Sequence, residues 1–359
     1  MPRDADDSAA SMAEDPGAPG LDAPGARRWL PRHPLAAGLA VAVVALLLLI
    51  GLAFLYFDDE PELFDVRAEA LARAGDMPER VWPGVTLVST LSRTVDILLH
   101  KHGGYLSNDV LPPGVLMDDI PNWEFGVVSQ VRDLAKALRN DMTRSQTQSR
   151  EDPDLSVAEP HFNYQNDAWL LPSTESEYEA GRKALERFLA RLMDERDMQA
   201  QFYARADNLA EWLALVEKRL GSLSQRLSAS VAQERENTDI ASLAAAAGST
   251  DERLAFMVKT PWLEIDDVFY EARGSAWALL LFLRAVEVDF GPVLQDKNAL
   301  ASLRQVIREL EGTQGVVWSP IILNGSGFGL VANHSITMAS YIGRASVALR
   351  DLRRLLEQG

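Results

Sequence analysis

Cysteine is absent from this chain of 359 residues, and only six of its 35 basic residues are lysine. The absence of cysteine excludes a disulfide framework, a zinc–thiolate site, an iron–sulfur cluster and a cysteine nucleophile. The 35 basic residues face 52 acidic ones, which gives a net charge of -17. Nucleic-acid binding needs a basic face that neutralises phosphates, so this balance argues against a nucleic-acid-binding protein.

The signatures of familiar enzyme classes are also absent. The chain has no G-x-S-x-G, S-x-x-K or H-E-x-x-H motif, no P-loop and no EF-hand loop. Each of these patterns places a nucleophile, a metal ligand or a phosphate cradle by a known mechanism. The sequence therefore identifies no catalytic residue, no metal ligand and no cofactor.

Composition divides the chain into three unlike segments. Residues 1–34 are rich in Ala, Gly, Pro, Asp and Ser, so we expect a disordered tail. Residues 35–57 are 23 consecutive residues without a charge. A helix of that length reaches roughly 34 Å, enough for a hydrocarbon core about 30 Å thick. We therefore expect a transmembrane helix at 35–57, followed by an exported domain at 58–359.

Charges flank the apolar segment unevenly. Three arginines stand just before it and four carboxylates just after it: Arg27, Arg28, Arg32, Asp58, Asp59, Glu60 and Glu62. The positive-inside rule then places the N-terminus in the cytoplasm. The apolar run is too long for a cleaved signal peptide, which favours an uncleaved signal anchor. The expected localisation is the bacterial inner membrane, crossed once, with the C-terminal domain in the periplasm. The lack of cysteine fits that oxidising compartment.

Apolar residues at spacings of three and four predict that the exported domain is all-α, a multi-helix bundle. Trp277–Leu283 is apolar on every side, as expected of a central buried helix. The longest stripe consists of Phe202, Ala206, Leu209, Leu213, Val216, Leu220, Leu223 and Leu227. This apolar face could pack against another helix of the same chain in a bundle, which we favour, or against a second copy in a coiled-coil dimer.

Residues 236–259 interrupt this helical pattern. They contain an alanine run followed by Gly248, Ser249 and Thr250, which is typical of a long exposed loop. We expect this loop to join two sub-bundles, at about 58–235 and 260–359.

Candidate ligand-binding residues fall in two places. The first is a polar stretch with aromatic neighbours: Arg139, Asn140, Arg144, Gln148, His161, Asn163, Asp167 and Trp169. Amide and guanidinium groups beside aromatic rings are typical of carbohydrate and peptide sites. The alternative is a hydrogen-bond network that fixes a loop on the bundle. The second place is Asn333 with His334, where a buried histidine with one hydrogen-bond partner is the alternative.

Long motifs relate the chain to a known family. They are DDIPNWEFG (118–126), LRNDMTRSQTQSREDPDL (138–155), AEPHFNYQNDAWLLPSTESEY (158–178), RADNLAEWLALVEKRLGSLSQRLSASV (205–231), TPWLEIDDVFYEARG (260–274) and GFGLVANHSITMASYIGRASVALRDL (327–352). With them the chain resembles an uncharacterised proteobacterial family of single-pass membrane-anchored proteins, a domain of unknown function. The resemblance implies membrane attachment and a helical exported domain. It brings no activity and no catalytic residues.

We therefore expect a binding or scaffold protein of the bacterial cell envelope, attached to the lipid bilayer through 35–57. The expected partner is an envelope protein or a cell-wall polymer, not nucleic acid, and a homo-oligomer stays open. Two alternatives also stay open. One is a periplasmic hydrolase or lyase that acts on envelope polymer with carboxylates and His161. The other is a ligand-binding sensor domain that signals through a partner.

Overall fold

The computed structural model describes most of the chain after residue 33. The described residues are 34–75, 82–144, 151–197, 199–231, 233–236, 255–319, 321–326 and 330–358. The predicted disordered tail, apart from Pro34, and the centre of the predicted loop at 236–259 lie outside them. Within the described part the fold is helical except for one antiparallel pair of strands, β1 (Gln233–Glu236) and β2 (Ala255–Val258). The prediction of an all-α multi-helix bundle is confirmed in this part of the chain. The two strands pair the ends of the segment expected as a loop.

The chain forms two compact units, Met1–Leu49 and Ile50–Gly359. The first unit contains most of helix α1 (Pro34–Phe57), which is 24 residues long. Among the described residues, which leave out the side chains at 34, 36 and 53–55, no helix is long and apolar enough to cross a bilayer. The transmembrane helix at 35–57 stays a prediction.

The second unit holds the remaining helices. The α-helices are α2 (Val66–Ala74), α3 (Val85–His100), α4 (Asp119–Ala137), α5 (Pro153–Phe162), α6 (Thr174–Leu192), α7 (Ala206–Ser228), α9 (Ile265–Asp289), α10 (Gly291–Asp296), α11 (Leu300–Glu311) and α12 (His334–Glu357). A π-helical turn, η2 (Leu138–Met142), extends α4. The 3-10 turns are η1 (Gly114–Leu116), η3 (Ala229–Val231), η5 (Trp262–Glu264) and η6 (Gly312–Gln314).

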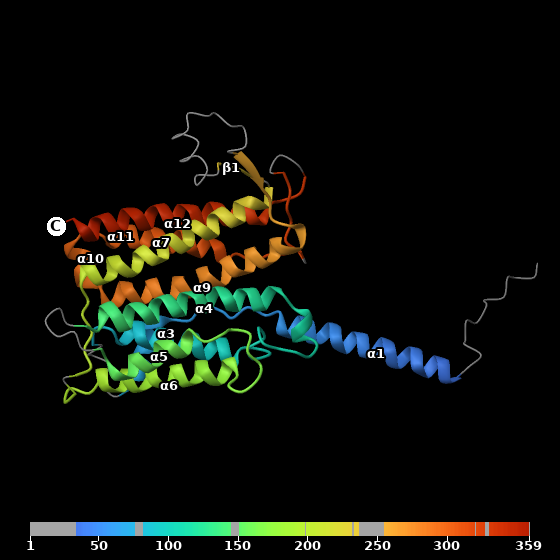
Figure 1. Ribbon diagram of the computed structural model, residues 1–359, viewed down its shortest axis with the longest axis horizontal. Helices are drawn as coiled ribbons and strands as arrows, with labels where there is room; N and C mark the ends of the chain where they lie inside the picture. The colour runs from blue at the N-terminus through green and yellow to red at the C-terminus, as the bar shows by residue number, and fades with distance from the viewer. Residues whose placement is uncertain are drawn as a thin grey trace, which may run out of the picture. The chain divides into compact units, whose positions relative to one another are not determined.

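These helices form two groups that meet along α4 and α9 (Figure 1). One group contains α2 to α6, and the other contains α7 and α9 to α12. The long apolar stripe of α7 packs along α12, so the chain uses this apolar face within the bundle. Helix α7 precedes the expected division at 236–259, yet it packs with α12, which follows that division. Along the chain, the boundary between the two helix groups therefore lies between α6 and α7.

Facing glycines let α4 and α9 approach closely. A Cβ atom on Gly126 would lie 2.1 Å from the carbonyl oxygen of Glu271. A Cβ atom on Gly274 would lie 2.0 Å from the carbonyl oxygen of Trp123. Neither position can take a side chain without moving a helix backbone, because core packing leaves no spare volume.

On both sides of the glycines, large and polar side chains of α4 and α9 contact each other across the crossing. The rings of Trp123 and Trp277 lie 5.1 Å apart between centroids, within the range of favourable aromatic pairs. The amide of Gln130 donates a 2.7 Å hydrogen bond to the hydroxyl of Ser275. Residues 277–283 are all buried, which confirms the central buried helix predicted there.

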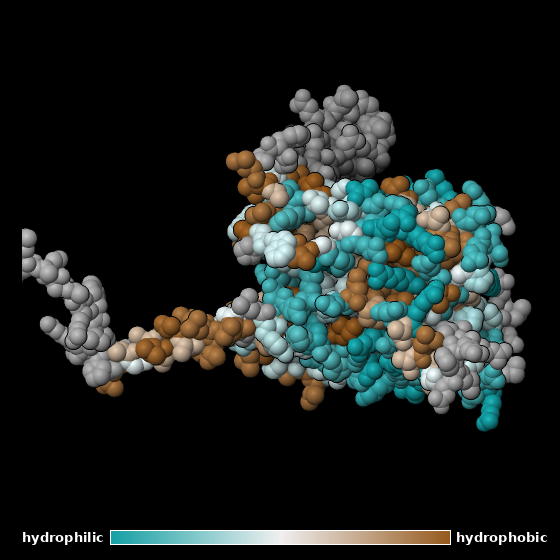
Figure 2. All heavy atoms as spheres, turned by 180° about the vertical axis from the view of Figure 1, so that it is seen from behind, coloured by the Kyte–Doolittle hydropathy of each residue, from teal (hydrophilic) through white to brown (hydrophobic). Residues whose placement is uncertain are grey.

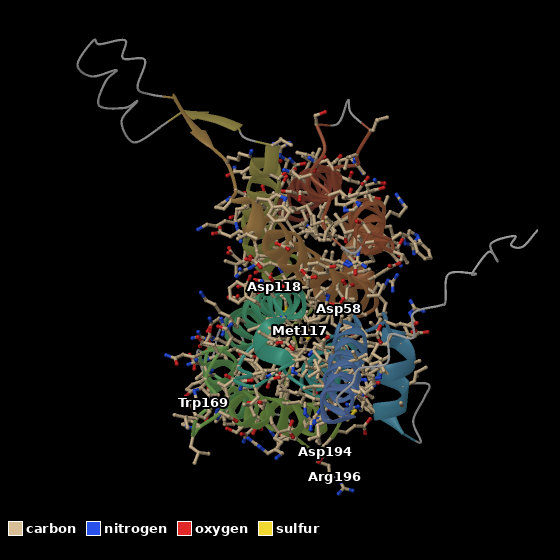
Figure 3. All side chains as sticks on the ribbon, turned by 90° about the vertical axis from the view of Figure 1, so that its right-hand side faces the viewer. Asp58, Met117, Asp118, Trp169, Asp194 and Arg196 are labelled. Atoms are coloured by element: carbon tan, nitrogen blue, oxygen red, sulfur yellow. The ribbon has the colours of Figure 1, made fainter. Side chains whose placement is uncertain are left out.

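The helices alternate in direction, so many of their connections meet at one end of the bundle, here called the loop end. It contains the C-termini of α3, α5, α7 and α11 and the N-termini of α4, α6, α9 and α12. Its segments are 58–62, 101–118, 163–173, 229–236, 255–264 and the described parts of 312–333 (Figure 3 looks onto this end). Three hydrogen bonds join neighbours there: Tyr105 to Asn166 (2.8 Å), Asn122 to Asp267 (2.7 Å) and Asn324 to Ser230 (2.8 Å).

The glycine crossing generates a prediction about stability. Replacing Gly274→Ala should destabilise the fold by roughly 1–3 kcal/mol, because the new methyl group overpacks a backbone contact. Chemical denaturation followed by circular dichroism of the full chain in detergent measures the effect.

Gly221→Ala is the matched control. Gly221 lies in α7 with open space around its Cβ position. The control should gain up to about 1 kcal/mol, since alanine favours helix more than glycine does. Equal denaturation midpoints for Gly274→Ala and the unmodified chain would contradict the close crossing.

Candidate functional site

The predicted residues between 139 and 169 form ion pairs with acidic neighbours rather than one site. Arg139 donates to Glu159 (2.8 Å) and to Glu151 (2.8 Å from Nη2). Nδ1 of His161 lies 2.8 Å from a carboxylate oxygen of Glu177. Each of these two side chains thus contacts a carboxylate from a neighbouring segment, for Arg139 in or just before α5 and for His161 on α6, as expected of a surface network.

The other predicted residues of this stretch are separated. Asn163 donates to Glu159 (2.6 Å), the carboxylate that also binds Arg139. Asn140 and Arg144 lie in and just after η2, partly exposed, and Gln148 lies outside the described residues. Asp167 and Trp169 are exposed in the 163–173 loop. The structure therefore brings Arg139 and Asn163 together through Glu159, and it places Asp167 and Trp169 apart from them at the loop end.

Asn333 and His334 begin α12 and hold the preceding loop. The carboxamide oxygen of Asn333 accepts from the backbone N–H of Ile336 (2.8 Å), a helix N-cap, and its NH₂ donates to the carbonyl of Gly325 (2.7 Å). Nδ1 of His334 accepts from the backbone N–H of Leu323 (3.2 Å). Burial lowers the pKa of His334, which favours the neutral ring that this acceptor role requires. These contacts are those expected of two residues that cap the helix and hold the loop before it.

A buried ion pair fixes the first loop of the loop end. Glu124 on α4 accepts from the backbone N–H groups of Leu106 and Ser107, each at 2.8 Å, and from the Ser107 hydroxyl. Its remaining partner is the ammonium of Lys101, which also donates to the carbonyl of Gly104. The two side chains are 3% and 0% exposed. A buried carboxylate needs such a full set of donors, because an unpaired buried charge is strongly unfavourable.

A second, largely buried pair connects the linker after α1 to helix α9. Arg273 on α9 donates to Glu60 (2.6 Å) and to the carbonyls of Thr313 (3.1 Å) and Gly315 (2.7 Å). Burial raises the pKa of Glu60, and the Arg273 guanidinium opposes that rise. Glu60 comes three residues after Phe57, the last residue of α1, and three residues reach at most roughly 11 Å. The end of α1 is therefore tied closely to the loop end.

Five aspartates lie beside this linker: Asp58, Asp118, Asp119, Asp266 and Asp267. Burial and the charges of the other four raise the pKa of Asp119 from 3.8 to about 7. Asp58 and Asp118 face the viewer near the middle of Figure 3. Over the described residues, no group of three or more histidines and carboxylates is arranged to hold a metal ion.

A groove of about 580 Å³ lies between the linker and α3. It is lined by residues 59–64 and by Arg93, Asp96, Ile97, His100, Lys101 and His102. The ring of His102 stacks on Tyr56, with 4.8 Å between centroids, and its Nδ1 lies 3.1 Å from Asp59. Of the ten predicted ligand-binding residues, the nine that the structure describes do not line this groove.

Exposed apolar side chains gather at the loop end. Outside α1, 19 large hydrophobic side chains are exposed among the described residues, and only Leu71, Val157, Leu215 and Val347 lie on the sides of helices. The other 15 belong to the loop end: Val110, Leu111, Val115, Leu116, Trp169, Leu170, Leu171, Val231, Trp262, Leu263, Val316, Trp318, Ile321, Leu330 and Val331. Figure 2 shows brown side chains protruding at this end, at the left of the bundle. Single exposed apolar residues are ordinary, but a gathered set marks an interaction surface.

Of these 15 residues, sequence reasoning selected only Trp169. A signal was available, because a large apolar residue stands within two positions of proline in four of the loops. The segments are Leu111-Pro112, Leu171-Pro172, Pro261-Trp262 and Trp318-Ser319-Pro320. Proline marks these residues as parts of turns, where an apolar side chain has no helix face to bury.

The fold and this surface define a class, a helical-bundle protein with one apolar, loop-bearing end. The chain belongs to the DUF2333 family, described as an uncharacterized protein conserved in bacteria, and the match covers residues 32–359. The resemblance to an uncharacterised bacterial family is thereby confirmed, while the membrane anchor and the proteobacterial range stay predictions. No curated protein and no solved structure matches the chain.

The raised pKa of Asp119 predicts a pH-dependent stability. In the folded chain Asp119 keeps its proton up to about pH 7, whereas in the unfolded chain it loses the proton near pH 3.8. Its contribution to stability is therefore complete below about pH 4 and is lost as the pH rises to about 7. The variant Asp119→Asn should be more stable than the unmodified chain at pH 8 by about 1 kcal/mol, discounted for partial exposure. Denaturation at pH 4 and pH 8 measures the difference.

Asp351→Asn, at an exposed side chain of α12 outside the aspartate cluster, is the control for the loss of one carboxylate. A pH-independent effect of Asp119→Asn would contradict the clustering of the aspartates.

Proposed function

We propose that the protein crosses the bacterial inner membrane once through 35–57 and presents its helical domain in the periplasm, where it binds an envelope component. The flanking charges support this orientation, since arginines precede the segment and carboxylates follow it. Helix α1 itself has no charged residue, and its described side chains between 37 and 52 are exposed or half-exposed. An isolated helix that is apolar on every face is favourable in hydrocarbon and unfavourable in water.

The observation that carries the proposal is the short, bonded linker at Glu60. A flexible stalk would let the domain move far from the end of α1. Instead, Glu60 enters a buried ion pair with Arg273 three residues after Phe57. On the proposed topology, the loop end is therefore held at the membrane surface. Its groove and its apolar side chains would then meet partners that are themselves at or in the membrane.

Binding is favoured over catalysis by the positions of the polar residues. The hydrolase or lyase alternative needs His161 and carboxylates around one open cavity. His161 instead pairs with Glu177, and neither residue is among those that line the groove. The sensor alternative is compatible with the same ligand-binding surface, and we retain it as a special case of binding through the loop end.

The topology predicts the activity of a fused reporter. Alkaline phosphatase joined after Gly359 should be active, because the enzyme gains activity only after export. The same fusion without 35–57 should be inactive and should leave the membrane fraction. An inactive full-length fusion that is present in membranes would contradict the proposed orientation.

The binding role predicts position-specific crosslinks in living cells. A photoreactive amino acid at His100, which lines the groove, should yield a protein or cell-wall-polymer adduct of defined mass. The same amino acid at Leu215, an exposed position on the side of α7, is the control and should yield none. Identical patterns at the two positions would contradict binding at the loop end.

A further inference from the structure

Exposed apolar tips project from four separate loops of the loop end. They are Leu116, Trp169, Leu171, Trp262, Leu263 and Trp318. Leu171 is 97% exposed, Trp318 92%, Leu263 74% and Trp262 71%. Exposure of so many large apolar side chains at one end of the bundle is unfavourable in water, and a gathered set of this kind marks an interaction surface.

Three of the six tips are tryptophans, the residue whose ring prefers the boundary between water and hydrocarbon. The buried tryptophans of the bundle, Trp123, Trp212 and Trp277, lie in its core. The exposed ones thus occur at the end where the chain leaves α1. Trp169 lies near the edge of this end in Figure 3, whereas Asp58 lies near its middle.

The charge of the residues near the tips affects which partner the tips can contact. Asp109, Asp118, Asp167, Glu264 and Asp266 lie in the same loops or immediately beside them. Carboxylates would be repelled by anionic lipid headgroups, so attraction by charge cannot hold this end on a membrane. Contact with a bilayer would have to come from the apolar tips.

The linker limits how far its attachment point on the bundle can be from the membrane. On the proposed topology, residue 57 is at the membrane surface, and Glu60, which Arg273 binds, is within roughly 11 Å of it. An interfacial layer of headgroups lies on each side of the hydrocarbon core, and the whole bilayer is about 40–45 Å thick. On the proposed topology, the part of the loop end around Glu60 therefore lies beside the headgroup layer, and the tips belong to the same end of the bundle.

We propose that the loop end rests on the bilayer and inserts its tryptophan and leucine tips into the interface of the leaflet that it faces. The inference rests on the proposed membrane span and adds a second, peripheral contact to it. The domain would then be held at two places, by α1 in the hydrocarbon core and by the four loop tips at the surface. The occupant of the apolar surface is lipid, and a protein partner on the tips is the competing outcome.

The absence of cysteine makes a direct test available in the full chain. Single substitutions Leu171→Cys and Leu263→Cys place a nitroxide spin label at two tips that contact little of the fold. Val347→Cys, exposed on the side of α12, is the water-facing control, and Leu46→Cys in α1 is the hydrocarbon reference. Each protein is reconstituted into phosphatidylcholine nanodiscs. Electron paramagnetic resonance then compares collisions of the label with oxygen, which enters lipid, and with a nickel chelate, which stays in water.

The expected result is an oxygen-to-nickel collision ratio at positions 171 and 263 several-fold above that at 347 and below that at 46. Ratios at 171 and 263 equal to that at 347, with a high ratio at 46, would overturn the insertion while leaving the span intact. A low ratio at 46 would instead overturn the proposed span. Quenching by brominated lipid tests the unlabelled protein. The triple variant Trp169→Phe, Trp262→Phe and Trp318→Phe should lose part of the quenching, and an unchanged quenched fraction would also overturn the insertion.

Discussion

The glycine crossing of α4 and α9 is the constraint on which the loop end depends. Because Gly126 and Gly274 bring backbone against backbone, the two helices have one register in which they fit. That register places both buried charges of the loop end. Glu124 precedes Gly126 by two residues and holds the loop after α3, while Arg273 directly precedes Gly274 and holds the linker after α1. The contact that joins the two helix groups therefore also positions the end of α1.

The same crossing has an electrostatic cost. Both α4 and α9 begin at the loop end, so their acidic first turns lie together and bring Asp118 and Asp119 toward Asp266 and Asp267. Helix N-termini partly offset this repulsion, since their free N–H groups favour negative charge. The offset is incomplete, because the pKa of Asp119 is still raised to about 7. The chain thus retains an unfavourable cluster at the end that also carries its apolar surface.

Sequence patterns were sufficient to predict the helices but not to predict the candidate functional site. Helix α7 and the buried centre of α9 follow directly from apolar periodicity, because one helix face or a whole helix must be buried. The polar stretch from Arg139 to Trp169 is different. Its residues are near in sequence, yet Arg139 bonds to two glutamates while Trp169 lies in a loop at the end of the bundle. The apolar surface was missed because its loops are far apart in sequence, from Val110 to Val331, and only the alternation of helix direction brings them together.

The two buried ion pairs explain why that surface has a defined position. A buried pair is a weak source of stability, but losing either partner leaves an uncompensated charge, so the geometry around it is strongly specified. At the loop end, Lys101–Glu124 fixes the loop between α3 and α4, and Glu60–Arg273 fixes the linker against α9 and η6. Loops that carry exposed leucines and tryptophans are thereby attached to the most buried part of the bundle. The apolar surface therefore has a defined position on the bundle, because two of its loops are held by these pairs.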